Sequence, residues 1–308
     1  MTARRLDYLH LDVFSRRPFE GNQLAVFPEA AGLDSALMQR IAREFNFSET
    51  TFVLGPGAAG TDVRMRIFTP GAEVPIAGHP TVGTTFALAE LGRIAPPRDT
   101  LTFDLAAGPT PVALQWEGGC LAFAWMTQPR PVYSPASVGA AALADALGIA
   151  VGEVAPGGLP IEVGSSGVPF LFVPMASRDA VDAVRPRPDR VSAVCAAAGR
   201  HVDGLFVFAA TSPAADGITA WSRMFAPDIG VFEDPATGIA SGPLGGYLVR
   251  HGLAPAASLD TPLVSLQGVR MGRPSRIHIA VETEGGAVSR VRVGGTAVCV
   301  ARGEFAVP

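Results

Sequence analysis

Three side chains in the 308-residue sequence have types and positions that suit acid–base chemistry. Glu49 begins a β-rich run, His79 lies at the expected mouth of a helix, and Asp234 comes just before another expected helix. Carboxylates and imidazole are the side chains that most often transfer protons in enzymes. Each also has a structural explanation: Glu49 could face water, His79 could belong to a capping turn, and Asp234 is a common N-cap residue. From the residues alone, both interpretations stay open.

The surroundings of His79 predict a strand followed by a helix. Residues 62–68 alternate between apolar and polar side chains, as in a strand with two different faces. Pro80 suits the first turn of a helix, where its missing N–H is no loss, and this helix is expected to run to Leu91. Its side chains are apolar on nearly every side, which is typical of an enclosed helix. We therefore expect a sheet curled around it.

The pattern around His79 returns near Asp234 in the second half of the chain. Three landmarks match in the same order, which predicts an internal duplication into two similar halves facing each other. The matches are Arg66, Phe68, Pro70, Pro80 and Gly83 with Arg223, Phe225, Pro227, Pro235 and Gly238, residues 24–28 with 171–174, and residues 49–53 with 203–207.

The first half is expected to open with a strand and a capped helix. Residues 6–14 alternate between polar and apolar side chains, which places Asp12 on the wet face of a strand. Asp34 or Ser35 can cap a helix with apolar residues at helical spacing, and this helix is expected to end near Asn46.

A proline-rich stretch, Pro129–Pro135, is the expected linker between the two halves. It divides the chain into an N-terminal domain, 1–128, and a C-terminal domain, 129–308, and the total length suits two domains. The second domain is expected to contain a helix from Pro235 to Arg250, and its last strand could return to the first domain.

The composition excludes several classes of partner. The chain is 48% hydrophobic and 17% charged, with a net charge of −4, so we expect neither a nucleic acid nor an anionic membrane to bind it. No apolar run approaches ~20 residues, and the N-terminus lacks the apolar core of a signal peptide. A cytoplasmic location is therefore expected.

The cysteines and histidines argue against thiol and metal chemistry. The three cysteines, Cys120, Cys195 and Cys299, are far apart in apolar or alanine-rich settings, which predicts buried small hydrophobic side chains. His79 stands alone in its motif and the other histidines are scattered, so no metal site is expected.

The ligand is expected to be a small anion. Two helix N-termini that converge on one site would present free N–H groups and partial positive charge, which suits a substrate carboxylate. Arg66 and Arg223 could assist, but an arginine at such a position more often ties a strand to a turn. Asp203 is the echo of Glu49, and the glycine after it favours a turn.

Four ordered motifs carry a family resemblance that covers essentially the whole chain. The segments Gly21–Val26, Ser48–Phe52, Ala77–Gly83 and Glu233–Gly238 resemble the PhzF (phenazine biosynthesis) family. The resemblance implies an α+β fold of the diaminopimelate-epimerase type: two pseudo-symmetric domains, each a β-barrel-like mixed sheet wrapped around a central apolar helix, with the active site in the cleft.

The resemblance also assigns roles to residues. It implies that Glu49 is the general acid/base, that His79 and Asp234 act with it in the cleft, and that no metal or organic cofactor is needed. The residues expected to bind substrate are Gly78, Pro80, Thr81, Thr237, Gly238 and Ile239. The chain departs from the family pattern at Ile239, where the family often has a serine, and this departure leaves the substrate open.

The implied activity is a cofactor-independent isomerisation that moves a proton between carbons of a small carboxylated cyclic or unsaturated substrate. The family's characterised reaction is the isomerisation of trans-2,3-dihydro-3-hydroxyanthranilate, and its members are expected to be homodimers. Two alternatives stay open: an epimerase or dehydratase on the same fold, and a non-catalytic protein that binds a small ligand. Two-cysteine racemisation is disfavoured because His79 and Asp234, not cysteines, occupy the helix mouths.

Overall fold

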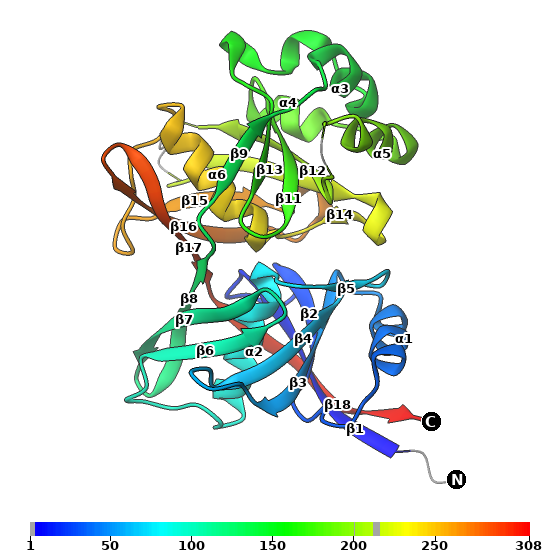
Figure 1. Ribbon diagram of the computed structural model, residues 1–308, viewed down its shortest axis with the longest axis vertical. Helices are drawn as coiled ribbons and strands as arrows, with labels where there is room; N and C mark the ends of the chain where they lie inside the picture. The colour runs from blue at the N-terminus through cyan, green and yellow to red at the C-terminus, as the bar shows by residue number, and fades with distance from the viewer. Residues whose placement is uncertain (1–3, 200, 212–215) are drawn as a thin grey trace. The chain divides into compact units, whose positions relative to one another are not determined.

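The computed structural model describes residues 4–199, 201–211 and 216–308 (Figure 1). This part of the chain is an α+β protein with eighteen strands and six α-helices. It divides into two compact units, Met1–Thr127 with Gly294–Pro308, and Gln128–Val293. Within the described ranges, no helix combines the length and the apolar character that crossing a membrane would require.

The first unit is a mixed sheet that the last strand of the chain completes. Its strand β1 pairs antiparallel with β2 and with β18, β2 runs parallel to β3, and β3 pairs antiparallel with β4. Strand β4 then pairs antiparallel with β5 and parallel with β6, and β6, β7 and β8 follow as antiparallel neighbours. The strands are β1 (Arg4–Val13), β2 (Asn22–Phe27), β3 (Glu49–Pro56), β4 (Val63–Phe68), β5 (Glu73–Val74), β6 (Thr100–Leu105), β7 (Gly108–Glu117), β8 (Cys120–Gln128) and β18 (Ala297–Val307).

Helix α1 (Ser35–Phe45) ends where its sequence predicts. The Asp34 side chain accepts a hydrogen bond of 2.7 Å from the Leu37 N–H, as an N-cap does, and Asn46 ends the helix in the left-handed conformation. Its buried side chains face β3 and β4. The predicted helix is therefore confirmed at both ends.

Helix α2 (Gly78–Glu90) is enclosed over most of its length, as its apolar composition predicts (Figure 1). It packs against β1, β2, β3 and β18. A Cβ atom at Gly83 would lie 2.5 Å from the Leu24 side chain and 2.7 Å from that of Val13, so the helix and the sheet are in direct contact there. The helix begins two residues before Pro80, which places His79 inside its first turn.

One prediction about β1 is wrong. Asp12, expected on the wet face, is only 1% exposed, because its carboxylate accepts a hydrogen bond of 2.7 Å from the Phe19 N–H. The carboxylate ties the loop after β1 back onto the strand, and that loop leads into β2.

The second unit contains a mixed sheet with helices α3, α4 and α5 packed together on one side (Figure 1). Strand β10 pairs antiparallel with β9 and β11, and β11 runs parallel to β12. Strand β12 pairs antiparallel with β13, β13 with β14, and β15 with β16, while β13 and β15 are parallel. The elements are β9 (Val132–Pro135), β10 (Glu162–Ser165), β11 (Pro169–Pro174), β12 (Gly204–Ala210), β13 (Ala220–Ala226), β14 (Val231–Asp234), β15 (Leu263–Gln267), β16 (Ser275–Glu284), β17 (Ala287–Gly295), α3 (Ala140–Leu147), α4 (Arg178–Ala183), α5 (Pro188–Ala196) and α6 (Gly238–Arg250).

Part of the predicted linker is a strand. Residues 132–135 form β9 and pair with β10, so only the start of Pro129–Pro135 connects elements. The prolines at 131 and 135 fall at the margins of the strand, where a missing N–H does little harm to the ladder.

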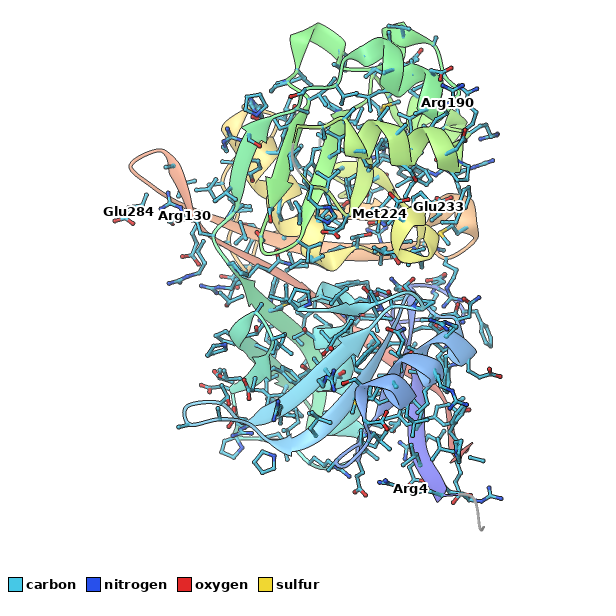
Figure 2. All side chains as sticks on the ribbon, turned by 45° about the vertical axis from the view of Figure 1, so that its right-hand side comes forward. Arg4, Arg130, Arg190, Met224, Glu233 and Glu284 are labelled. Carbon is cyan, nitrogen blue, oxygen red and sulfur yellow. The ribbon has the colours of Figure 1, made fainter. Side chains whose placement is uncertain are left out.

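Helix α6 begins three residues later than predicted, at Gly238. Asp234 is the last residue of β14 and pairs with Met224 of β13, and the residue before a proline favours an extended backbone. Met224 and Glu233, both labelled in Figure 2, belong to these two strands. The N-cap residue of α6 is Thr237, so Asp234 is not the N-cap.

The two predicted echo arginines make matching contacts. Arg66 forms a two-pronged ion pair with Glu73 at 2.7 and 2.6 Å, and Arg223 forms one with Glu233 at 2.8 and 2.9 Å. Each guanidinium also lies 5.0 Å from the ring of the phenylalanine two residues on. Both arginines therefore tie a strand to the segment that returns along it, which confirms the structural interpretation.

Candidate active site

The first unit brings Glu49 and His79 into contact. Glu49 is the first residue of β3 and is aligned with Leu24 of the parallel strand β2, while His79 lies in the first turn of α2. The Oε2 atom of Glu49 is 3.1 Å from Nδ1 of His79. The Glu49 side chain is 18% exposed and that of His79 is 3% exposed, so this carboxylate is half-buried and the imidazole is enclosed.

Asn22 is a third member of this cluster, and sequence reasoning did not select it as a site residue. Its Nδ2 atom is 3.2 Å from the same Nδ1 atom of His79, and the residue is only 1% exposed. Gly21 has a positive φ of 70°, and a Cβ there would lie 2.3 Å from the Val13 carbonyl oxygen. The sequence carried one signal for Asn22: the residue before it is a glycine, which a tight turn requires, and Asn22 itself begins a strand.

Burial keeps His79 neutral. Loss of solvation lowers the pKa of its imidazole to about 3, and a hydrogen bond with the backbone of Gln23 opposes this effect only in part. The contact between Glu49 and His79 is therefore a hydrogen bond near neutral pH, and not an ion pair with an imidazolium.

A neutral imidazole couples its tautomer to the protonation of Glu49. If Nδ1 carries the proton, it donates to the Glu49 carboxylate, and the Asn22 amide turns its oxygen toward the ring. If Nδ1 is bare, it accepts from Asn22 or from a protonated Glu49. The Nε2 atom of His79 is buried, and no hydrogen-bond partner for it lies within the described residues. The cluster can thus hold one mobile proton, and it leaves one polar atom, Nε2 of His79, without a partner within the described residues.

In the second unit, Asp234 is held by the turn that leads into α6. The Thr237 hydroxyl donates to Oδ2 of Asp234 at 2.6 Å. The side chain of Gln267, from β15, contacts both residues of this turn. Asp234 and Thr237 are 4% and 5% exposed, so the carboxylate is almost fully buried. Sequence reasoning did not select Gln267.

The residues predicted to bind substrate fall into the first turns of two helices. Gly78, Pro80 and Thr81 belong to α2, and the Thr81 hydroxyl donates to the Ala77 carbonyl at 2.7 Å within that helix. Thr237 precedes α6, and Gly238 and Ile239 are its first two residues, all buried. In the part of the chain described, no three His, Cys, Asp or Glu side chains are grouped so that they could hold a metal ion.

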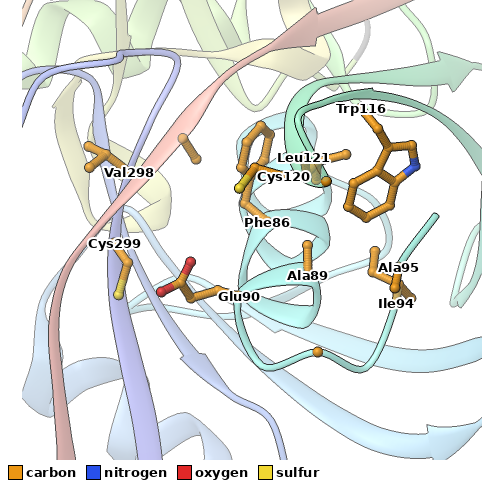
Figure 3. A pocket seen from close by; sticks show the side chains of 13 residues that line it. Phe86, Ala89, Glu90, Ile94, Ala95, Trp116, Cys120, Leu121, Val298 and Cys299 are labelled. Atoms are coloured by element: carbon orange, nitrogen blue, oxygen red, sulfur yellow. The ribbon is translucent and has the colours of Figure 1, made fainter.

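A cavity of about 510 Å³ in the first unit lies near the other end of α2 (Figure 3). Phe86 and Glu90 of the helix line it together with Cys120 of β8 and Cys299 of β18. At 1.5 Å per residue, Glu90 is about 16 Å along the helix axis from His79. None of the predicted site residues lines this cavity.

The cysteine prediction holds for one of three residues. Cys195 is buried, whereas Cys120 is exposed and Cys299 is partly exposed. Burial, with smaller contributions from Asp228 and Asp203, raises the pKa of the Cys195 thiol to about 12. Since the thiolate is the reactive form, iodoacetamide at pH 8 is expected to alkylate Cys120 and Cys299 and to spare Cys195.

Peptide mass spectrometry after a short reaction measures this selectivity. Denatured protein is the control, in which all three thiols are expected to react. Modification of Cys195 in the native protein as fast as that of Cys120 would contradict the buried assignment.

Comparison with known proteins places the chain in a family. The model of the phenazine biosynthesis-like protein family, PhzC-PhzF, matches residues 11–303. A trans-2,3-dihydro-3-hydroxyanthranilate isomerase of Pseudomonas aeruginosa is 39% identical over 305 residues, which cover 96% of this chain and 98% of the relative. Several such relatives are named isomerases, and the chain is an enzyme of that class.

Solved structures agree with this assignment. A PhzF family protein of Bacillus anthracis superposes with a TM-score of 0.83 at 29% identity, covering 98% of this chain and 99% of that one. A predicted epimerase of Pseudomonas aeruginosa gives a TM-score of 0.79 at 34% identity, covering 97% and 99%. The chain therefore belongs to the PhzC-PhzF family of phenazine biosynthesis-like proteins.

Proposed function

We propose that this enzyme is a cofactor-independent isomerase in which Glu49 moves a proton between two carbons of a small carboxylated substrate. The contact of 3.1 Å between the Glu49 carboxylate and the His79 imidazole carries the proposal. A half-buried carboxylate beside a neutral imidazole is suited to accept a proton and to give it back.

The proposed reaction needs no other reactant. The Glu49 carboxylate takes a proton from a substrate carbon, the C–H electron pair enters the neighbouring π system, and the new O–H group protonates a different carbon. His79 stays neutral and orients Glu49 through Nδ1, with Asn22 on the same atom. A polar group of the substrate would supply the partner that the buried Nε2 atom lacks among the described residues.

We infer that Asp234 and the first turn of α6 bind the same substrate, and that the two units are duplicated halves of a diaminopimelate-epimerase-like fold. The order of strand pairings supports this duplication, because β1 to β7 and β10 to β16 pair in the same sequence of parallel and antiparallel steps. The matching ion pairs of Arg66 and Arg223 support it further.

The substrate proposed is of the trans-2,3-dihydro-3-hydroxyanthranilate type, which a relative's name provides. Its carboxylate would suit the free N–H groups of a helix N-terminus. Ile239 places an apolar side chain in the first turn of α6, so a close analogue with a less polar substituent is the expected alternative. A homodimer stays part of the proposal, and light scattering would measure it.

Incubation with trans-2,3-dihydro-3-hydroxyanthranilate in heavy water tests the reaction class. The expected product carries solvent deuterium at one carbon and has a shifted double bond, both visible by NMR. Deuterium with an inverted stereocentre and unmoved double bonds would instead indicate an epimerase, and loss of water a dehydratase. Binding of the compound without any hydrogen exchange would contradict the isomerase and support the alternative of a non-catalytic binding protein.

A further inference from the structure

Gln267 is a buried amide whose polar atoms all contact the turn that leads into α6. Its Oε1 atom accepts from the Thr237 N–H at 3.1 Å, and its Nε2 atom donates to the Asp234 carbonyl at 2.7 Å and to Oγ1 of Thr237 at 2.9 Å. The residue is 0% exposed. One side chain thus satisfies two backbone groups and one hydroxyl of the same short segment.

The bond to the hydroxyl sets the direction of a hydrogen-bond chain. Thr237 has one hydroxyl proton to give, and its oxygen already accepts from Gln267. The proton is therefore directed at Oδ2 of Asp234, 2.6 Å away. Hydrogen bonds to an ionised carboxylate are stronger than neutral ones, so the chain from Gln267 through Thr237 favours a carboxylate in one orientation.

The duplicated position in the first unit shows that the fold does not require an amide here. In the register of the parallel pairs, Val63 aligns with Phe103 and Ala220 with Ser265. The residue two positions after Phe103 is Leu105, whereas the one two positions after Ser265 is Gln267. A buried amide costs free energy unless its hydrogen bonds are made, so its presence in this unit alone points to a use at Asp234.

The residue after Gln267 adds a second constraint on the same segment. Gly268 has a positive φ of 78°, and a Cβ there would lie 2.6 Å from the Pro235 carbonyl oxygen and 2.3 Å from that of Arg273. The chain therefore passes directly against the turn between Asp234 and Thr237. This contact brings the Gln267 amide within hydrogen-bonding distance of both residues.

We propose that Gln267 is a positioning residue, which acts on the substrate only through Thr237 and Asp234. It holds the turn by two backbone hydrogen bonds and orients the Asp234 carboxylate by the third. The inference rests on the proposed function, in which Asp234 binds the substrate.

Two substitutions separate orientation of the carboxylate from support of the fold. Thr237→Val removes the hydroxyl but leaves both backbone bonds of Gln267 in place. Gln267→Glu keeps the size of the side chain, but once ionised it can only accept, and it would draw the Thr237 proton away from Asp234. Protonation at lower pH would return one donor to the glutamate variant.

Each of these variants is expected to lose about 10- to 100-fold in kcat/KM, the worth of one hydrogen bond to a charged group. The deficit of Gln267→Glu is expected to shrink as the pH falls from 8 to 5, while that of Thr237→Val stays constant. Thr237→Ser is expected to retain much more activity than Thr237→Val. A pH-independent deficit in the glutamate variant, or a Thr237→Val enzyme within twofold of the wild type, would overturn the proposal.

A control variant and a second measurement distinguish failure of the Gln267 proposal from failure of the proposed isomerase function. Ser265, on the same strand as Gln267, makes a buried hydrogen bond of 2.9 Å with Ser222 of β13, and Ser265→Ala removes it without touching Thr237, so kcat/KM is expected to stay unchanged. In protein labelled with ¹³C-threonine, a protected Thr237 hydroxyl gives two Cβ signals in mixed H₂O and D₂O. The pair is expected in the wild type, whatever the substrate, and its Cβ shift is expected to move in Gln267→Glu at pH 8, where the hydroxyl changes its acceptor from Asp234 to the glutamate. A Cβ shift in that variant equal to that of the wild type would refute the chain even if the isomerase activity were established.

Discussion

Glu49→Gln is expected to slow proton exchange between substrate and solvent by about 10²- to 10⁴-fold, the usual contribution of a general acid or base. The amide has the size of the carboxylate and can still hydrogen-bond to the His79 imidazole 3.1 Å away. It cannot take up a proton near neutral pH. The substitution therefore keeps the contact with His79 but removes the proton acceptor. The rate of deuterium incorporation, measured by NMR at saturating substrate, gives the effect directly.

The expected loss is in kcat, with KM little changed, because the substitution removes a proton acceptor and not a binding group. Glu304→Gln is the matched control. It removes another carboxylate of the same unit, one that pairs with Arg5 through a single contact, and both side chains are more than half exposed, so the pair contributes little. Exchange that continues in Glu49→Gln at the rate of the control would remove Glu49 from the mechanism.

Local sequence signals predicted elements well where a cap or a periodic pattern decides them. Helix α1 begins and ends as predicted because Asp34 and Asn46 act on their own neighbours. The start of α6 was placed too early, because the ladder pairing of Asp234 with Met224 competes with helix formation and lies ten residues back along the chain. Asp12 was misplaced for the same kind of reason, since its partner Phe19 is brought back by a turn.

The family motifs placed Glu49 and His79 in one site, and the structure puts them in contact. Asn22 and Gln267 were not predicted as site residues because a single amide side chain forms no periodic pattern. Their contacts depend on strand register. Strand β2 runs parallel to β3 and brings Asn22 next to His79. Strand β15 runs parallel to β13 and brings Gln267 next to Thr237. Such pairs join residues 57 and 30 positions apart, beyond the reach of local pattern.

Acid is expected to destabilise the protein through His79. The pKa of the buried imidazole is about 3, against 6.5 for the unperturbed group. Above pH 6.5 neither the folded nor the unfolded state binds the proton, so His79 adds nothing to the pH dependence. Between pH 6.5 and 3 the unfolded state binds it and the folded state does not, and the free energy of unfolding falls by about 1.4 kcal/mol per pH unit.

Replacement of His79 by glutamine tests this linkage. The variant is expected to be less stable than the wild type at pH 7, where the loss of packing dominates, and the difference is expected to shrink by about 3 kcal/mol as the pH falls to 4. Urea unfolding followed by tryptophan fluorescence at several pH values measures it. His201→Gln is the control, since that side chain is 82% exposed and its replacement leaves the buried imidazole of His79 in place. The same pH dependence of the free energy of unfolding in the wild type and His79→Gln would contradict the prediction. It would mean that the imidazole is charged or solvated in the folded protein. The contact between Glu49 and His79 would then be an ion pair and not a neutral hydrogen bond.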